Sequence, residues 1–178
     1  MKYRFFTLIG LLFLFTQTAA PLPGPPITEL PESRLRLFHT HTGERIDIVF
    51  RRGENYVAGA LDSLNHFLRD HRTGEVHEYD PRVFDLLADL TESVHKAGAE
   101  LQIICGYRTP KSNEFLRQNS TGVAKNSLHM LAEAIDIRLP GVPLSKFRDA
   151  ALAMHRGGVG YYAASNFIHV DVGRVRRW

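Results

Sequence analysis

Two short segments in the second half of the chain contain residues that can bind a metal ion. The segment "SLHMLAEAID" places His129 seven residues before Asp136, and "NFIHVDVG" places His169 two residues before Asp171. On one helix, His129 and Asp136 would lie about 10.5 Å apart along the axis, which is too far for a shared cation. Apolar residues alternate around Asp136, so we expect His129 in a turn and Asp136 on the strand that follows.

The pair His169 and Asp171 fits a strand with one polar face. Residues two apart on a strand point to the same side, and the apolar residues around them point to the other side. If this strand lies beside the strand of Asp136, two imidazoles and one carboxylate converge. Such a set with an open fourth position is typical of a catalytic zinc ion, which polarises carbonyl groups and activates water. The alternative is that each histidine is a structural hydrogen-bonding residue.

The surrounding pattern predicts the elements that position these residues. Alternating residues on both sides of Gly43 indicate a hairpin over residues 34–53. Asp80 is typical of a helix start, and Gly98 is typical of a helix end. Three further helices are expected, over residues 55–71, within 111–127 and over 146–156, and Ser145 is expected to cap the last of them. Four further strands are expected over residues 100–108, 132–139, 157–162 and 166–173.

These elements predict an α+β fold with one small antiparallel sheet flanked by helices. The chain of 178 residues is long enough for one domain with its own core. Its 44% hydrophobic and 23% charged residues are normal for a globular protein, which excludes a disordered or fibrous class. The single cysteine, Cys105, lies in an apolar strand-like run, so we interpret it as a buried structural thiol.

The N-terminal segment has the features of a secretory signal peptide. Lys2 and Arg4 precede an apolar run over residues 5–15, and small residues follow it. The run is shorter than the roughly 20 residues of a spanning helix, and an uncleaved anchor is the alternative. We predict three parts, without a membrane span after processing: a signal peptide over residues 1–20, a proline-rich linker over 21–34 and a folded domain over 35–178 that contains the candidate zinc ligands.

The charge of the chain is mildly basic. The formal net charge is +3, and the basic residues are dispersed until the final segment "GRVRRW". A nucleic-acid-binding domain usually concentrates its lysines and arginines on one face or helix. We therefore expect no nucleic-acid partner, and the charge suits an anionic polymer equally well.

The motifs resemble those of a known group of zinc peptidases. The segment "SLHMLAEAID" is similar to the S-x-H-x-x-[GA]-x-A-x-D signature of peptidases related to D-Ala-D-Ala carboxypeptidases, VanX-type dipeptidases and hedgehog signalling domains. Together with "GYRTPKSN", "GVAKNSLHM", "GGVGYY" and "FIHVDVGRVRRW", it resembles the exported murein endopeptidases of the MepK type. The similarity runs from about Leu35 to Trp178.

The resemblance implies a hedgehog-like or D-Ala-D-Ala-peptidase-like domain with one zinc ion held by His129, Asp136 and His169. It implies a zinc metallopeptidase that hydrolyses amide bonds in the peptide cross-links of peptidoglycan. The expected bonds join two diaminopimelate residues, or D-Ala and diaminopimelate, in the periplasm or cell envelope. Two alternatives stay open: a carboxypeptidase or dipeptidase that trims stem peptides, and a non-catalytic zinc-containing module that binds the cell wall.

The chain differs from several members of this group of peptidases at the position of the general base. Several relatives carry a glutamate three residues before the last histidine ligand, and this chain has Asn166 there. We predict that Asp171 replaces it as the catalytic base, with orientation of a ligand histidine as its alternative role. The phenols of Tyr161 and Tyr162 are further candidates, mainly as hydrogen-bond donors.

Other polar residues are expected around the metal. Arg108 matches an arginine that relatives place beside the ion, so it is predicted to bind a substrate carboxylate or to stabilise the oxyanion; a loop arginine is the alternative. Asn113, Ser127 and Tyr161 are predicted to bind substrate, and support of the metal ligands from behind is the alternative role for Asn113 and Ser127. Ala132 occupies a position that is usually glycine, and we expect it to need no positive φ.

Overall fold

Residues 30–178 are described by the computed structural model of the chain. The predicted signal peptide over residues 1–20 and most of the predicted linker over 21–34 lie outside the described residues. The first strand, β1, begins at Glu32, within the range predicted as linker.

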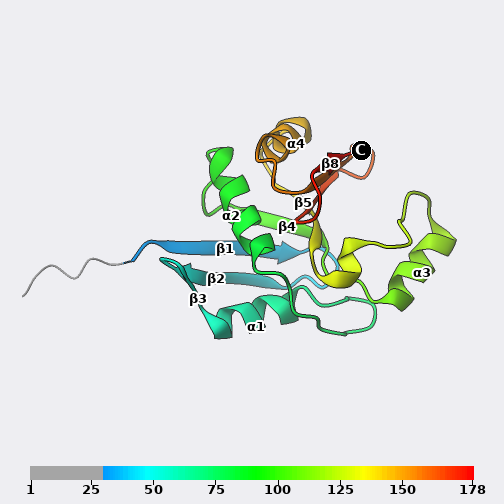
Figure 1. Cartoon of the computed structure of the whole chain (residues 1–178), viewed down its shortest axis with the longest axis horizontal. Helices are drawn as coiled ribbons and strands as arrows, with labels where there is room; N and C mark the ends of the chain where they lie inside the picture. Colours follow the sequence, from blue (N-terminus) through cyan, green and yellow to red (C-terminus); the bar gives the residue numbers. More distant parts are fainter. Residues whose placement is uncertain (1–29) are drawn as a thin grey trace, which may run out of the picture.

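One eight-stranded mixed sheet organises the described part of the chain (Figure 1). Its order is β3-β2-β1-β4-β5-β7-β6-β8. The strands are β1 (Glu32–His39), β2 (Arg45–Arg52), β3 (Asn55–Tyr56), β4 (Glu100–Cys105), β5 (Ala134–Arg138), β6 (Gly158–Tyr162), β7 (Phe167–Asp171) and β8 (Arg176–Arg177).

The α+β class is confirmed, but the prediction of a small antiparallel sheet is wrong. Strands β1 and β4 are parallel neighbours, and so are β6 and β8. Two helices separate β1 and β2 from β4 in the sequence, and a connection of this length lets the chain return in the direction of β1. The sheet is therefore larger than the hairpin signals alone indicated.

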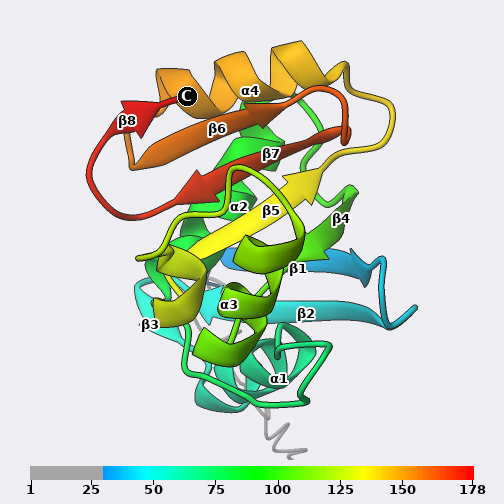
Figure 2. The ribbon, with the colours of Figure 1, turned by 90° about the vertical axis from the view of Figure 1, so that its right-hand side faces the viewer.

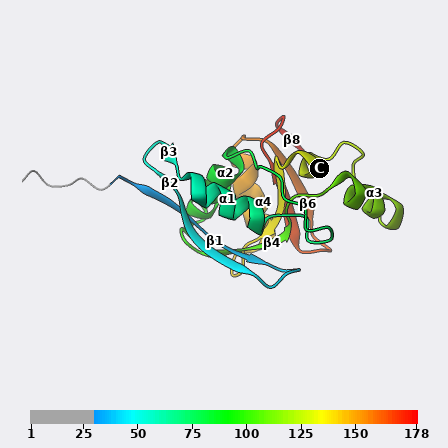
Figure 3. The same ribbon diagram turned by 90° about the horizontal axis from the view of Figure 1, so that it is seen from below.

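The helices cover the two faces of the sheet unequally. The helices are α1 (Ala58–Phe67), α2 (Arg82–Ser93), α3 (Pro110–Asn119) and α4 (Leu144–Ala153), with the 3₁₀ turn η1 (Leu128–Leu131). Helices α1, α2 and α4 contact β2, β1 and the β6–β7 pair, respectively, and they gather on one side of the strands (Figure 3). Helix α3 lies in front of the sheet in Figure 2, whereas α2 and α4 lie behind it.

Local signals explain most of the element boundaries. The hairpin turn of β1 and β2 contains Gly43 with φ of +76°, as predicted. The carboxylate of Asp80 accepts a hydrogen bond from the backbone N–H of Arg82 at 3.0 Å and so caps α2. Gly98 lies beyond the end of that helix, and Ser145 lies inside α4 rather than at its cap, so these two predictions are wrong.

The central strands separate the core from the polar residues of interest. Ile135, Ile137, Ile168 and Val170 are at most 1% exposed and belong to the core that the helices cover. The residues between them point to the opposite face, as the alternation predicted. Within residues 30–178, every helix is too short or too polar to cross a lipid bilayer.

A buried histidine makes the stability of this fold sensitive to acid. His39 is fully buried, its ring edge packs on Phe67, and its Nε2 has no hydrogen-bond partner in the described chain. Burial, assisted by neighbouring His41, lowers the pKa of His39 to about 4. Burial and Arg72 lower the pKa of His71 to about 4 as well.

We therefore expect the free energy of unfolding to decrease as the pH falls from 6.5 to 4. In this range histidines of the unfolded chain bind protons that the folded chain does not, and the loss for His39 amounts to up to about 3 kcal/mol. Chemical denaturation at several pH values measures this slope. His39→Phe should reduce it and His66→Ala, at an exposed position of α1, should not; equal slopes in both variants would refute the assignment.

Candidate metal centre

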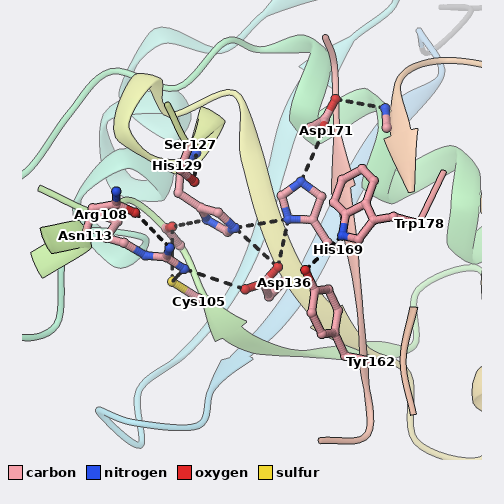
Figure 4. A network of polar contacts seen from close by, with 12 residues as sticks. Cys105, Arg108, Asn113, Ser127, His129, Asp136, Tyr162, His169, Asp171 and Trp178 are labelled. Carbon is pink, nitrogen blue, oxygen red and sulfur yellow. Dashed lines mark hydrogen bonds and ion pairs between the residues drawn. The ribbon is translucent and has the colours of Figure 1, made fainter. Parts of the chain in front are cut away.

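Three side chains from separate elements meet on the polar face of the sheet (Figure 4). Strands β5 and β7 pair so that Asp136 lies directly opposite His169. Asp136 Oδ1 lies 2.9 Å from His169 Nδ1 and 3.2 Å from His129 Nε2, and the two ring nitrogens are 3.1 Å apart. The structure thus brings together the three residues that the sequence predicted as metal ligands.

The spacing of these three atoms suits a small cation. Ligand atoms about 2.0–2.1 Å from a tetrahedral zinc ion lie about 3.3 Å from one another, close to the distances observed. All three side chains are buried. Because the lone pairs of two imidazoles and a carboxylate oxygen point at one another there, the arrangement needs a cation or a proton between them.

Each imidazole is oriented by a partner on its far side. His129 Nδ1 lies 2.8 Å from the carbonyl oxygen of Gly106, and His169 Nε2 lies 3.1 Å from Asp171 Oδ2. Both partners are acceptors, so these nitrogens must carry the protons. The opposite nitrogens, His129 Nε2 and His169 Nδ1, are left as ligands, which is the usual arrangement around protein-bound metals.

A model of the M15 peptidase family described as peptidoglycan L,D-endopeptidase MepK matches residues 29–178. The chain belongs to this MepK family. It is 42% identical over 149 residues to the probable peptidoglycan L,D-endopeptidase MepK of Haemophilus influenzae, covering 83% of this chain and 80% of that protein. It is 42% identical over 163 residues to the peptidoglycan L,D-endopeptidase MepK of Escherichia coli K12, covering 90% and 89%.

Membership of the MepK family confirms two predictions, the resemblance and the assignment to a peptidase family. A search of solved structures gave no match. The hedgehog-like character of the fold therefore stays a prediction.

A tight turn on each side of His129 fixes its position. The hydroxyl of Ser127 accepts a weak hydrogen bond of 3.4 Å from the His129 N–H at the start of η1. Ala132 ends η1 with φ of +52°, which lets the Glu133 N–H reach the carbonyl of Leu128. The prediction that Ala132 needs no positive φ is wrong, because the chain must reverse there to enter β5.

The Gly106 carbonyl is held by a close backbone approach. The Tyr107 N–H donates to the carbonyl of Leu68 at 2.8 Å. A Cβ at Gly106 would lie 2.5 Å from that same oxygen, so no larger residue fits without moving the backbone. The loop that orients His129 therefore depends on glycine at position 106.

Buried charges dominate the electrostatics of the centre. Burial disfavours the charged form of His129, but the Asp136 carboxylate and Cys105 together outweigh it and raise the pKa of His129 to about 10 in the metal-free protein. Burial also opposes ionisation of Asp136, and His129 reverses this effect and holds the pKa of Asp136 well below its usual range. A bound cation replaces the proton that the pair would otherwise hold.

Arg108 lies beside the ligands, as predicted from the sequence. Its Nη2 is 3.9 Å from Asp136 Oδ2 and 3.4 Å from Cys105 Sγ, and its Nη1 donates to Asn113 Oδ1 at 3.1 Å. The Nε atom is buried and has no hydrogen-bond partner within residues 30–178. The residue as a whole borders the pocket above the metal centre, although this Nε atom is not exposed to it.

Asn113 and Cys105 are buried beside the metal centre and do not border the pocket. Asn113 is buried and holds Arg108 and the loop carbonyl of Ala124, so it supports the site rather than bordering the pocket. Cys105 is buried as predicted, but its sulfur lies within 4.8 Å of the ligand atoms of His129 and Asp136. Cys105, His129 and Asp136 are thus a second possible ligand set, whereas the set with two histidines has all its distances at or below 3.2 Å.

A pocket of about 330 Å³ opens above the ligands. The loop after α3 and the β6–β7 hairpin form its walls, and Ser127, Tyr162 and Trp178 border it. Tyr161 points to the other face of β6, where the Arg148 guanidinium lies 4.5 Å from its ring centre, so its position does not support the predicted substrate contact. Asn166 lines a different cavity.

Asp171 occupies a position that suits orientation better than proton transfer. It is fully buried and does not border the pocket. Besides His169, its carboxylate accepts the N–H groups of Gly158 and Gly173 at 2.8 and 2.9 Å and pairs with Arg176 at 2.7 Å. Burial opposes ionisation, but these hydrogen bonds hold the pKa of Asp171 well below its usual range.

The three ligands can be tested one at a time. We expect His129→Ala, Asp136→Ala and His169→Ala each to abolish binding of one zinc ion per chain, because two remaining ligands hold zinc weakly. Elemental analysis of the dialysed proteins measures the zinc content. His66→Ala is the control and should retain zinc. A ligand variant that binds zinc as well as the unchanged protein does would remove that residue from the set.

The contacts of Asp171 predict the effect of Asp171→Asn on metal affinity. We expect zinc affinity to fall about 10- to 100-fold, because an amide is a weaker acceptor for the His169 N–H and a weaker partner for Arg176. Competition with a chelating dye measures the change. The control is Asp149→Asn, which alters an exposed carboxylate on α4. Full zinc affinity combined with lost turnover would instead support the base role.

Proposed function

We propose that this chain is a zinc-dependent murein endopeptidase that acts in the periplasm. The observation that carries the proposal is the convergence of His129, Asp136 and His169 within 3.2 Å of one another below an open pocket. The family supports it, since the relatives are named peptidoglycan L,D-endopeptidases. The signal-like segment over residues 1–20 supports export to the compartment where peptidoglycan lies.

The chemistry of the three ligands fits zinc. Two imidazole nitrogens and one carboxylate oxygen are typical zinc ligands and leave one position open for water or substrate. A bound zinc ion supplies Lewis acidity, which polarises an amide carbonyl and makes water a nucleophile near neutral pH. The protein contributes the burial of the site and the fixed orientation of both imidazoles.

The substrate proposed is a peptide cross-link between two diaminopimelate residues, with the D-Ala–diaminopimelate link as a second target. Such peptides carry free carboxylates, which a guanidinium binds well. Arg108 and Arg176 both border the pocket. Arg108 is thus proposed to bind a substrate oxygen, either a carboxylate or the carbonyl that develops negative charge.

Digestion of cross-linked muropeptide dimers tests the proposed function. We expect the zinc-loaded protein to split dimers into monomers, with the fragments identified by mass spectrometry. A chelator should stop the reaction and added zinc should restore it. His129→Ala should reduce the rate by at least about 1,000-fold, because the metal contributes most of the activation of water and carbonyl.

Other products would identify the alternatives. Shortened stem peptides with intact cross-links would indicate a carboxypeptidase or dipeptidase. A protein that binds one zinc ion and intact sacculi without releasing fragments would be a cell-wall binding module. Either outcome would overturn the endopeptidase proposal.

A further inference from the structure

An aromatic side chain lies directly beside a metal ligand. Gly160 pairs with His169 across β6 and β7, and the absence of a side chain at Gly160 leaves room for Trp178. A Cβ at Gly160 would lie 2.7 Å from the indole ring. The ring centres of Trp178 and His169 are 5.2 Å apart, so the indole forms one wall of the metal centre.

The backbone holds Trp178 in this place. Its N–H donates to the carbonyl of Val159 at 3.2 Å, and its own main-chain oxygen accepts from the Tyr161 N–H at 3.1 Å. The Arg176 guanidinium lies 4.9 Å from the indole centre. The indole is half exposed, yet contacts with β6, His169 and Arg176 fix its orientation.

The indole in turn holds the phenol of Tyr162. Trp178 Nε1 lies 2.9 Å from the Tyr162 hydroxyl, and the phenol ring stacks on Phe167 at 4.6 Å with an interplanar angle of 16°. An indole N–H can only donate, so the hydroxyl oxygen of Tyr162 is the acceptor in this contact. Its proton is left for another acceptor, and none is found among residues 30–178.

Tyr162 is placed so that its hydroxyl proton can be donated to a molecule in the pocket. Tyr162 borders the same pocket as the three ligands. In Figure 4, Arg108 and Tyr162 lie on opposite sides of Asp136, and the phenol oxygen is turned toward Trp178 and the metal centre. Among the described residues that line this pocket, Asp136 has the only carboxylate side chain, and the other polar side chains are imidazole, hydroxyl, amide, indole and guanidinium groups.

We propose that Tyr162 is a catalytic hydrogen-bond donor and that Trp178 is its positioning residue. The Tyr162 hydroxyl donates to the carbonyl oxygen of the scissile amide and strengthens this bond as negative charge develops on that oxygen. Trp178 occupies the other side of the hydroxyl and so sets the direction of its proton. This inference rests on the proposed endopeptidase function and adds a donor opposite Arg108.

Tyr162→Phe tests the catalytic role directly. The variant keeps the ring that stacks on Phe167 and removes only the hydroxyl. We expect kcat on muropeptide dimers to fall about 100-fold, with a smaller change in KM and unchanged zinc content, as for loss of one oxyanion donor. Tyr161→Phe is the matched control, since that ring faces α4. A wild-type kcat in Tyr162→Phe would overturn the role.

A double-variant cycle tests whether Trp178 acts through Tyr162. Trp178→Phe keeps an aromatic ring beside His169 and loses the N–H donor, so we expect kcat to fall about 10-fold. Trp178→Phe combined with Tyr162→Phe should be no slower than Tyr162→Phe alone, because the donor is already absent. Losses that multiply in the double variant would show that Trp178 works independently and would overturn its positioning role.

Fluorescence gives a readout that does not depend on turnover. Trp178 is the only tryptophan of the chain, so the indole emission reports this site alone. We expect Tyr162→Phe, which removes the hydrogen-bond acceptor of the indole, to change the emission spectrum, and Tyr161→Phe to leave it unchanged. Identical spectra for all three proteins would refute the contact between Trp178 and Tyr162.

The unchanged protein separates failure of this inference from failure of the proposed function. If the zinc-loaded protein does not split dimers, the endopeptidase function is wrong and the role of Tyr162 in it is overturned as well. If the protein splits dimers and Tyr162→Phe does so equally fast, only the inference about Tyr162 is overturned.

Discussion

The register between β5 and β7 is the constraint on which the rest of the site depends. It sets Asp136 opposite His169 and, on the next strands, aligns Cys105 and Gly160 in the same row. A slip of one residue would turn Asp136 toward the helices and bring its apolar neighbours to the polar face. Burial of those neighbours in the core stabilises the register. The same hydrophobic burial therefore also brings Asp136 and His169 together. His129 then completes the set from the turn that leads into β5.

The ligand atoms are prepared for a cation before one binds. The Gly106 carbonyl and the Asp171 carboxylate each accept the proton of one imidazole and leave its other nitrogen facing Asp136. Burial strengthens these interactions, because little water competes for the donors and acceptors. Arg108 adds a positive charge near the outer oxygen of Asp136. The centre therefore combines fixed ligand geometry with a guanidinium on the outer side of the Asp136 carboxylate.

The sequence predicted that His129, Asp136 and His169 converge, because their positions follow simple rules. Two of them alternate with apolar residues on strands, and the third lies in the turn before one of these strands. The sequence did not predict the sheet order, since strand pairing is decided by contacts between distant segments. A one-residue register shift in β4 turned Cys105 toward Asp136, and strict alternation cannot reveal such a shift. The distinction between Tyr161 and Tyr162 was available, because Tyr161 lies two residues after the apolar Val159 and so shares its core face.

The two imidazoles differ in how easily a mutation can remove the hydrogen-bond acceptor that orients each of them. His169 depends on the Asp171 side chain, which a single codon change can delete. His129 depends on a peptide carbonyl, which every amino acid retains, so only a change that displaces the Gly106 backbone can remove it. Random substitutions are therefore more able to disturb the orientation of His169 than that of His129. Natural loss-of-function alleles should gather around the carboxylate that supports His169 and at the few glycines that permit close backbone approach.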